Sequence, residues 1–311
     1  KKGFCFMEFL HFLSQFRTDE GDIFFQLVTY TAQELFVVGI ICWLFWCSNK
    51  RLAYTLGFSY FTSGILVQGL KITFRIPRPW ILDSSFQPVA SAVPGATGYS
   101  FPSGHTQSIT ALFGTAALHF RKHLHQALCF VVIFLVGFSR MYLGCHTPKD
   151  VIVSFSISFL CVIFCYHYIY RKKSFEKTPG KVAVIMLFIS LALSFYSLFL
   201  EKTGYIDSIY AKDCLKAGGA GAAFALGYYL EQRFIRFRLP ENTKHKILRL
   251  VFGLLGALII QEGLKPLIGT SLPASFLRYF LTVFWILTVY PFLFTKYEAR
   301  TKNVQKNANE K

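Results

Sequence analysis

Charged side chains are scarce in this chain. Only 16% of its 311 residues are Asp, Glu, Lys or Arg, whereas soluble domains contain about 25%. Hydrophobic residues make up 53% of the chain, and aromatic residues make up 18%. This composition excludes an ordinary soluble domain and places the chain in the membrane class.

Acidic residues are the rarer of the two charged classes. The chain has 16 Asp and Glu against 33 Lys and Arg, which gives a formal net charge of +17. A basic chain can bind nucleic acid, but here the basic residues fall in short clusters between apolar runs. That distribution is typical of the cytoplasmic loops of membrane proteins. We therefore expect the bilayer as a partner and no nucleic acid.

Three kinds of local signal are missing. The eight cysteines show no C-x2-C pairing with histidines, so we expect neither a disulfide framework nor a zinc site, and no other metal or cofactor. Glu8 and His11 interrupt the first apolar run, which argues against a signal peptide. No N-x-S/T sequon points to a glycosylating compartment, and this favours a bacterial plasma membrane.

Long apolar runs recur along the rest of the chain, and they predict an all-α, polytopic membrane helix bundle. We expect about nine spans, near residues 28–47, 53–73, 105–120, 126–144, 149–170, 182–200, 214–234, 247–268 and 276–295. Small residues cluster at 217–227, which predicts close helix packing there.

These runs suggest three regions. Residues 1–26 form an N-terminal amphipathic segment, too short to span and expected to lie along the interface. Residues 27–173 form a core that contains three polar motifs. Residues 174–311 add a four-helix membrane region and a basic cytoplasmic tail. Lysine and arginine gather at alternate ends of the predicted spans, and the motifs lie at the other ends. The positive-inside rule therefore places the motifs on the non-cytoplasmic face.

The first motif has the pattern K-x6-R-P and ends the second predicted span. Its cations are Lys71 and Arg78, and two prolines turn the chain beside them. Cations at a helix end are often interfacial anchors. A guanidinium can also bind two phosphate oxygens, while an ammonium acts as a point charge. The motif alone leaves both interpretations open.

The second motif is Pro-Ser-Gly-His at residues 102–105. We expect Ser103 and Gly104 at a helix N-terminus, where free N–H groups favour an anion. Ser103 can equally be a simple N-cap. His105 can be a catalytic group or an interfacial histidine.

The third motif has the pattern S-R-x5-H-x3-D and supplies Arg140, His146 and Asp150. The i,i+4 spacing lets the carboxylate of Asp150 accept a hydrogen bond from the His146 ring, which fixes the tautomer. A structural pair at a helix start would look the same. Together the three motifs collect three cations, two histidines, a hydroxyl and one carboxylate, and this set of groups suits a phosphate.

The three motifs match the signature of the type 2 phosphatidic acid phosphatase superfamily, which the chain resembles over roughly residues 50–170. This superfamily also includes glucose-6-phosphatases, sphingosine-phosphate phosphatases and vanadium haloperoxidases. The resemblance implies a metal-independent phosphatase in which His146 is the nucleophile, Asp150 orients it and His105 is the acid and base. It implies that the phosphate is held by the remaining motif residues, Lys71, Arg78, Ser103, Gly104 and Arg140.

The resemblance favours a lipid phosphate phosphatase acting on phosphatidate, phosphatidylglycerol phosphate or an isoprenyl diphosphate. A glucose-6-phosphatase-like enzyme for a soluble sugar phosphate is the alternative, because those relatives have a similar layout of spans. A transporter that only binds phosphate is a third hypothesis. Haloperoxidase chemistry is disfavoured because those relatives are soluble. The oligomeric state cannot be predicted from these features.

Overall fold

The computed structural model describes residues 2–297, with side chains from residue 6 onward, and its regular structure consists of helices. In chain order they are α1 (Lys2–Ser14), α2 (Asp19–Tyr30), α3 (Glu34–Trp43), η1 (Leu44–Ser48), α4 (Lys50–Phe74), α5 (Pro79–Leu82), η2 (Ala90–Ala92), α6 (Gly104–His119), α7 (His123–Tyr142), α8 (Pro148–Cys165), η3 (Tyr166–Arg171), α9 (Ser174–Lys177), α10 (Pro179–Lys202), α11 (Ser208–Leu230), η4 (Glu231–Ile235), α12 (Thr243–Gly263), α13 (Lys265–Ile268), α14 (Leu272–Phe284) and η5 (Trp285–Val289).

Large apolar side chains cover the outside of the longest helices. Phe134, Phe188 and Ile259 are each about two-thirds exposed, at 67%, 71% and 69%. A soluble protein does not expose apolar surface on this scale, whereas a bilayer covers it. Among the described residues, five helices are long and apolar enough to cross a membrane, or six if the bent pair α2 and α3 is one span. The predicted membrane helix bundle is thus confirmed.

Eight of the nine predicted spans each coincide with a helix, but α4, α6 and α11 are not among the five apolar ones. These three helices carry small and hydroxyl side chains that face the protein interior. In α4, for example, Thr55, Ser59 and Ser63 are fully buried. Interior helices need less apolar surface than helices that contact lipid. The number of helices that cross the membrane stays a prediction.

The predicted span at 28–47 contains a break. The chain breaks between α2 and α3, which meet at an angle of 40°. The Thr31 hydroxyl donates to the Val28 carbonyl at 2.7 Å, and Gln33 adopts an extended backbone conformation. A hydroxyl that bonds the preceding turn competes with helix continuation. The break brings the first turn of α3 to the edge of the site described below.

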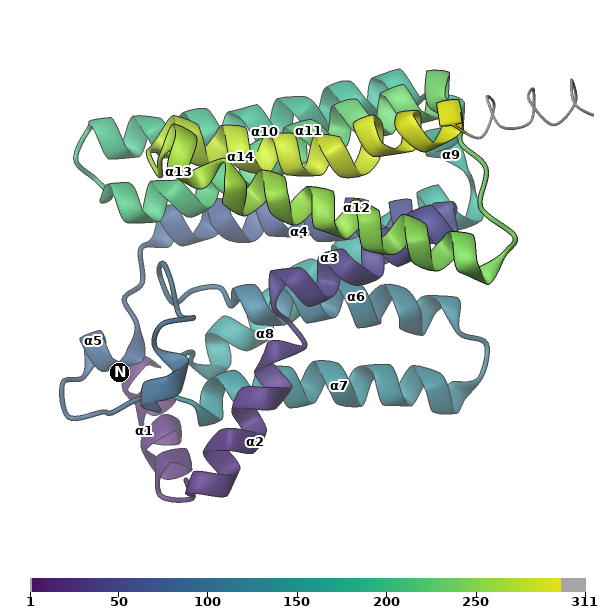
Figure 1. Cartoon of the computed structure of the whole chain (residues 1–311). Helices are drawn as coiled ribbons and strands as arrows, with labels where there is room; N and C mark the ends of the chain where they lie inside the picture. Colours follow the sequence, from purple (N-terminus) through teal and green to yellow (C-terminus); the bar gives the residue numbers. More distant parts are fainter. Residues whose placement is uncertain (1, 298–311) are drawn as a thin grey trace, which may run out of the picture.

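Helix α4 lies between the two halves of the protein. It packs against α6 and α8 on one side and against α10 and α11 on the other (Figure 1). Asn49 begins α4, because its side chain accepts a hydrogen bond from the N–H of Leu52 at 3.0 Å. Arg75 ends it in the left-handed conformation, with φ of 49°. The C-terminal helices therefore rest directly on the helix that carries the first motif.

The small residues of α11 allow close helix contact, as expected. A Cβ atom at Gly219 would lie 2.3 Å from the carbonyl oxygen of Phe276 on α14. A Cβ atom at Gly218 would lie 2.0 Å from the hydroxyl of Ser194 on α10. Because only glycine avoids these overlaps, α11 is fixed tightly between its two neighbours.

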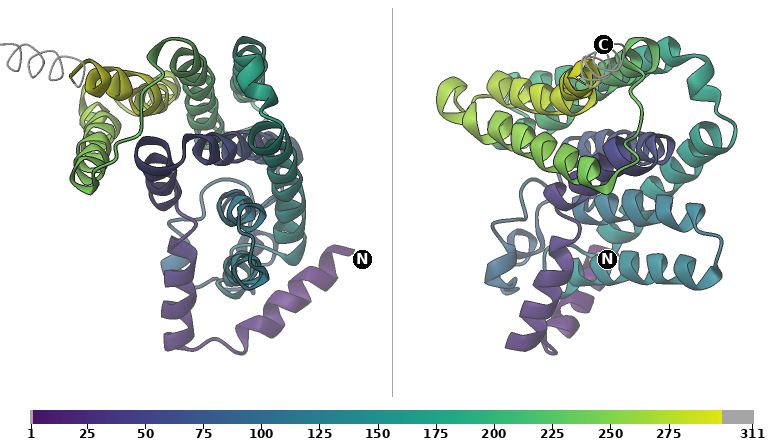
Figure 2. Two further views of the ribbon diagram at one scale, coloured as in Figure 1. Left: turned by 90° about the vertical axis from the view of Figure 1, so that its right-hand side faces the viewer. Right: turned by 45° about the vertical axis from the view of Figure 1, so that its right-hand side comes forward.

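The N-terminal segment is helical. Helices α1 and α2 form a V-shaped pair on the side away from α10–α14 (Figure 2). The acidic residues at 19, 20 and 22 form the first turn of α2, where the helix dipole favours negative charge. The interfacial location of α1 stays a prediction, and the predicted basic tail beyond residue 297 lies outside the described residues.

A buried ion pair joins the two halves at the end opposite the motifs. Glu231, which is 0% exposed, accepts hydrogen bonds from the Lys50 ammonium and, at 2.6 Å, from the Tyr54 hydroxyl.

We predict that Glu231→Gln destabilises the protein by about 3 kcal/mol, because it leaves the Lys50 charge uncompensated. Thermal unfolding in detergent measures this loss.

The matched control is Glu176→Gln, which removes the half-exposed ion pair with Arg51. That change should cost less than about 1 kcal/mol. Equal unfolding temperatures for the two variants would contradict the assigned role of Glu231.

Candidate active site

The three motifs meet at one end of the bundle. The C-terminal ends of α4 and α7 and the N-terminal ends of α6 and α8 all lie on the left in Figure 1. The first motif ends α4, the second begins α6, and the third joins α7 to α8. Helices that alternate in direction therefore bring residues far apart in the sequence to one place.

His146 lies in the short connection between α7 and α8. Its backbone N–H and that of Cys145 both donate to the carbonyl oxygen of Arg140, at 3.2 and 2.9 Å. The ring is 1% exposed, and its Nε2 atom lies 3.0 Å from Nη1 of Arg78. Because a guanidinium can only donate, Nε2 is the acceptor and the neutral ring carries its proton on Nδ1. This tautomer leaves the lone pair of Nε2 facing the cations.

Asp150 lies behind His146. Its Oδ2 atom is 3.5 Å from Nδ1 of His146. The same oxygen accepts hydrogen bonds from the Thr147 N–H at 2.9 Å and from the Ser100 hydroxyl at 2.6 Å. Asp150 and Thr147 also form a capping box at the start of α8. The carboxylate therefore has a structural role and also faces the proton-bearing nitrogen of the histidine.

Lys71 and Arg78 point into the protein, at 6% and 5% exposure. Lys71 Nζ donates to the carbonyl oxygen of Tyr99. Arg78 donates to the carbonyl oxygens of Thr97 and Gly98, at 2.7 and 3.0 Å. Interfacial anchors would extend toward water instead. Burial, aided by the charge of Arg140, lowers the pKa of Arg78 to about 10, so that its guanidinium is still charged at neutral pH.

Arg140 is the most deeply buried cation, at 1% exposure in the last turn of α7. Its Nη1 atom donates to the Thr29 hydroxyl at 3.3 Å. Its Nε and Nη2 atoms have no hydrogen-bond partner among the described residues. Unpaired buried donors are costly, and an anion would satisfy them.

The second motif begins α6. Ser103 is its N-cap, with the hydroxyl accepting from the Thr106 N–H at 3.3 Å, so the N-cap interpretation is correct. Binding of phosphate by Ser103 stays a prediction. A Cβ atom at Gly104 would meet no atom within 4 Å. The first N–H groups of α6 therefore border open space, where an anion is favoured.

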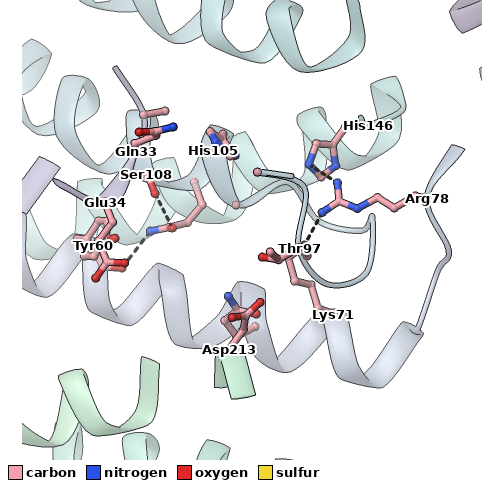
Figure 3. Close-up of a pocket in the computed structure, with 15 residues that line it drawn as sticks. Gln33, Glu34, Tyr60, Lys71, Arg78, Thr97, His105, Ser108, His146 and Asp213 are labelled. Carbon is pink, nitrogen blue, oxygen red and sulfur yellow. Dashed lines mark hydrogen bonds between the residues drawn. The ribbon is translucent and has the colours of Figure 1, made fainter. Parts of the chain in front are cut away.

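A pocket of about 290 Å³ connects these groups (Figure 3). Five of the predicted site residues line it, namely Lys71, Arg78, Gly104, His105 and His146. The other three, Ser103, Arg140 and Asp150, are buried but do not line it. The pocket is further lined by Ala32, Gln33, Glu34, Tyr60, Gln68, Gly95, Thr97, Gln107, Ser108 and Asp213.

Several of these lining residues were not predicted from the sequence. Glu34 begins α3 and Asp213 lies on α11, far from the motifs in the chain. Asp213 is paired with Lys216 at 2.7 Å. A lone acidic residue at a helix start carries no signal of its own. Ser100, which bonds Asp150 but does not line the pocket, lies in the connection between α5 and α6.

The electrostatics of the site keep His146 neutral. Burial lowers the pKa of its imidazole well below the usual value, and the charges of Arg78, Lys71 and Arg140 lower it further. A neutral imidazole has an unprotonated nitrogen, so the ring can act as a nucleophile at neutral pH once Nε2 no longer accepts from Arg78.

Comparison with known proteins identifies the family. The model of the PAP2 superfamily matches residues 52–174. A second model, described as "PAP2 superfamily phosphatase, transmembrane extension", matches residues 215–302. Together the two ranges cover more than half of the chain.

Three relatives illustrate the similarity. Sphingosine-1-phosphate phosphatase 1 of Mus musculus is 26% identical over 78% of this chain and 59% of its own length. Phosphatidylglycerophosphatase B of Bacillus subtilis (strain 168) is 30% identical over 28% of this chain and 46% of its own length. Undecaprenyl-diphosphatase BcrC of the same organism is 26% identical over 49% of this chain and 76% of its own length. The chain thus spans less than two thirds of the length of the first two relatives.

Among solved structures, the crystal structure of Aquifex aeolicus LpxE is similar, with a TM-score of 0.46 and 27% identity over 52% of this chain and 94% of that one. The family matches fall on the helices that carry the three motifs and on the C-terminal helices that pack against them. This chain belongs to the PAP2 superfamily, and it carries that family's transmembrane extension.

Proposed function

We propose that this protein is an integral membrane phosphatase that hydrolyses a lipid phosphomonoester or diphosphate through a phosphohistidine on His146. Membership of the PAP2 superfamily supports the reaction class. The names of the relatives suggest sphingosine 1-phosphate, phosphatidylglycerol phosphate and undecaprenyl diphosphate as model substrates. Phosphatidate is a further candidate.

The observation that carries this proposal is the setting of His146. Its Nε2 atom lies 3.0 Å from the Arg78 guanidinium, and its Nδ1 atom lies 3.5 Å from the Asp150 carboxylate. A nucleophilic histidine needs one unprotonated nitrogen and, near the protonated nitrogen, a carboxylate that favours the positive ring. A protein that only binds phosphate does not require this arrangement.

In the first step, Nε2 of His146 attacks phosphorus and the bond from phosphorus to the leaving oxygen breaks. His105, which lines the same pocket, donates a proton to that oxygen. Asp150 stabilises the positive charge that develops on the His146 ring. The alcohol of a monoester, or the lipid monophosphate of a diphosphate, leaves, and the phosphoryl group stays on the histidine.

In the second step, His105 removes a proton from water, and the water oxygen attacks phosphorus. The bond between phosphorus and Nε2 breaks, which releases inorganic phosphate and restores His146. Lys71, Arg78 and Arg140, together with the N–H groups at Gly104, stabilise the charge on the phosphoryl oxygens in both steps. Ser103 begins the helix that carries these N–H groups.

Metal independence follows from the same cations. Lys71, Arg78 and Arg140 are three buried cationic side chains of the motifs. These side chains supply the charge stabilisation that a metal ion supplies in other phosphatases.

We further propose that the pocket opens on the non-cytoplasmic face of a bacterial plasma membrane. The basic clusters at residues 50–51, 121–122 and 171–173 lie at the helix ends opposite the motifs. The positive-inside rule places those ends in the cytoplasm.

A second candidate is a phosphatase for a polar, hydroxyl-rich ester such as a sugar phosphate. The lining of the pocket away from His146 favours it, because the side chains of Gln68, Gln107 and Ser108 make that part polar. The exposed apolar helices around the site favour the lipid instead, since they hold the pocket within reach of the bilayer.

The test is phosphate release by the purified protein in detergent, with a chelator present. The substrates are phosphatidate, sphingosine 1-phosphate, an isoprenyl diphosphate and glucose 6-phosphate. We expect preferential release from a lipid. Preferential release from glucose 6-phosphate would support the second candidate, and loss of activity in chelator would contradict metal independence.

We predict that His146→Ala lowers turnover by at least about 1,000-fold, because the nucleophile is lost. His123→Ala is the matched control, since His123 lies on the exposed first turn of α7 at the opposite end of that helix. This control should keep wild-type rates. Substantial turnover in His146→Ala would contradict the phosphohistidine mechanism. If the wild type binds substrate but does not turn it over, the protein is a phosphate-binding membrane protein and not a phosphatase.

We also predict a specific pH dependence. The lowered pKa of His146 places its protonation well below pH 6.5, so the acid limb of kcat/KM for the wild type should lie below that pH. Arg78→Gln removes a nearby positive charge, which should raise the pKa of His146 and move the acid limb to higher pH. Both pH profiles are measured with the same substrate, so that ionisation of the substrate does not contribute to the difference between them. An unchanged limb in the variant would show that Arg78 does not control His146.

A further inference from the structure

Lys71 and Arg78, the cations of the first motif, donate hydrogen bonds to consecutive backbone carbonyl groups. The loop of residues 97–100, here called the carbonyl loop, accepts three hydrogen bonds from them. They run from Arg78 Nη2 to Thr97 at 2.7 Å, from Arg78 Nε to Gly98 at 3.0 Å, and from Lys71 Nζ to Tyr99. The direction in which both cations point therefore depends on the position of this loop.

The carbonyl loop also reaches the carboxylate behind the nucleophile. Its last residue, Ser100, donates its hydroxyl proton to Asp150 Oδ2 at 2.6 Å. The Ser100 N–H donates to the carbonyl oxygen of Ile76 at 2.8 Å. A displacement of the loop would thus disturb Lys71, Arg78 and Asp150 together.

The carbonyl loop has no regular secondary structure to fix it. Tyr99 joins it to α11, because its ring stacks on that of Tyr210, with 4.0 Å between the centroids and 17° between the planes. Both rings are half-buried and pack against the largest apolar core of the protein. Stacked aromatic pairs add stabilisation beyond the area that they bury.

Tyr210 lies in the first turn of α11, the helix that is fixed tightly between α10 and α14. One turn later, Asp213 approaches the same loop, and its Oδ2 atom lies 3.7 Å from where a Cβ atom of Gly98 would be. Tyr210 also lies between the two family matches, at 52–174 and 215–302. The C-terminal helices therefore contact the site through residues that neither match covers.

We propose that Tyr210 is a positioning residue for the phosphatase reaction, and this proposal rests on the proposed function. Through Tyr99 it holds the carbonyl loop, and through the loop it aligns Lys71 and Arg78 on the phosphate. The C-terminal helices are then part of the catalytic unit as well as a membrane anchor.

Tyr210→Ala should lower kcat/KM by about 10-fold to 100-fold, as small displacements of positioned groups do. It should also raise the inhibition constant for inorganic phosphate, because the cations no longer align on the anion. Tyr210→Phe keeps the ring and should behave as the wild type. Ile209→Ala, on the neighbouring residue with a 62% exposed side chain, is the control for changes in α11 and should have no effect.

A double-mutant cycle with Tyr99 separates positioning from general stability. Tyr99→Ala should reproduce the loss, and the double variant Tyr99→Ala with Tyr210→Ala should lose no more than either alone. Additive losses would overturn the proposal. So would a lower kcat with an unchanged phosphate inhibition constant, which indicates only a smaller folded fraction. If Tyr210→Ala does not fold, Tyr210→Leu is measured in its place.

The positioning role of Tyr210 can be tested even if the proposed function is wrong. If the wild type releases phosphate from no substrate, calorimetry with inorganic phosphate tests the positioning role on its own. Weaker phosphate binding by Tyr210→Ala than by Tyr210→Phe would support that role. Equal affinity would overturn it.

Discussion

The burial of three cations in one small volume is the constraint on which this structure depends. Lys71, Arg78 and Arg140 are each no more than 6% exposed, and burial of an uncompensated charge is costly. The fold offsets part of that cost with carbonyl oxygens from the 97–100 loop and from Cys145. The remainder is left for a phosphate dianion. Affinity for the substrate and instability of the empty site therefore have the same origin.

The same positive charge acts on His146, the nucleophile of the proposed reaction. It disfavours protonation of His146, while the Arg78 guanidinium determines which ring nitrogen carries the proton. Asp150 completes the arrangement from the other side, and its position is fixed by the cap of α8 and by Ser100. The capping role that a cautious interpretation would assign to Asp150 is thus compatible with the catalytic one, because one short helix start provides both.

The sequence was sufficient to predict the helical membrane fold and the proximity of the three motifs, because apolar runs and helix direction determine both. The break between α2 and α3 could not be predicted, since Thr31 and Gln33 interrupt the helix inside an otherwise apolar run. The contribution of α11 was equally hidden. Tyr210 and Asp213 reach the site only through tertiary packing, and neither belongs to a local pattern. Sequence motifs identify the reacting groups, whereas the groups that hold them are identified by the structure.

Transfer of a phosphoryl group to His146 is the step that the proposed function requires, and rapid quenching can detect it. Radiolabelled substrate is mixed with the enzyme, and the reaction is stopped in base within milliseconds. The modified peptide is then located by mass spectrometry. We predict an acid-labile phosphoryl group on Nε2 of His146 and overall retention of configuration at phosphorus. Inversion of configuration, or a label on another residue, would contradict it.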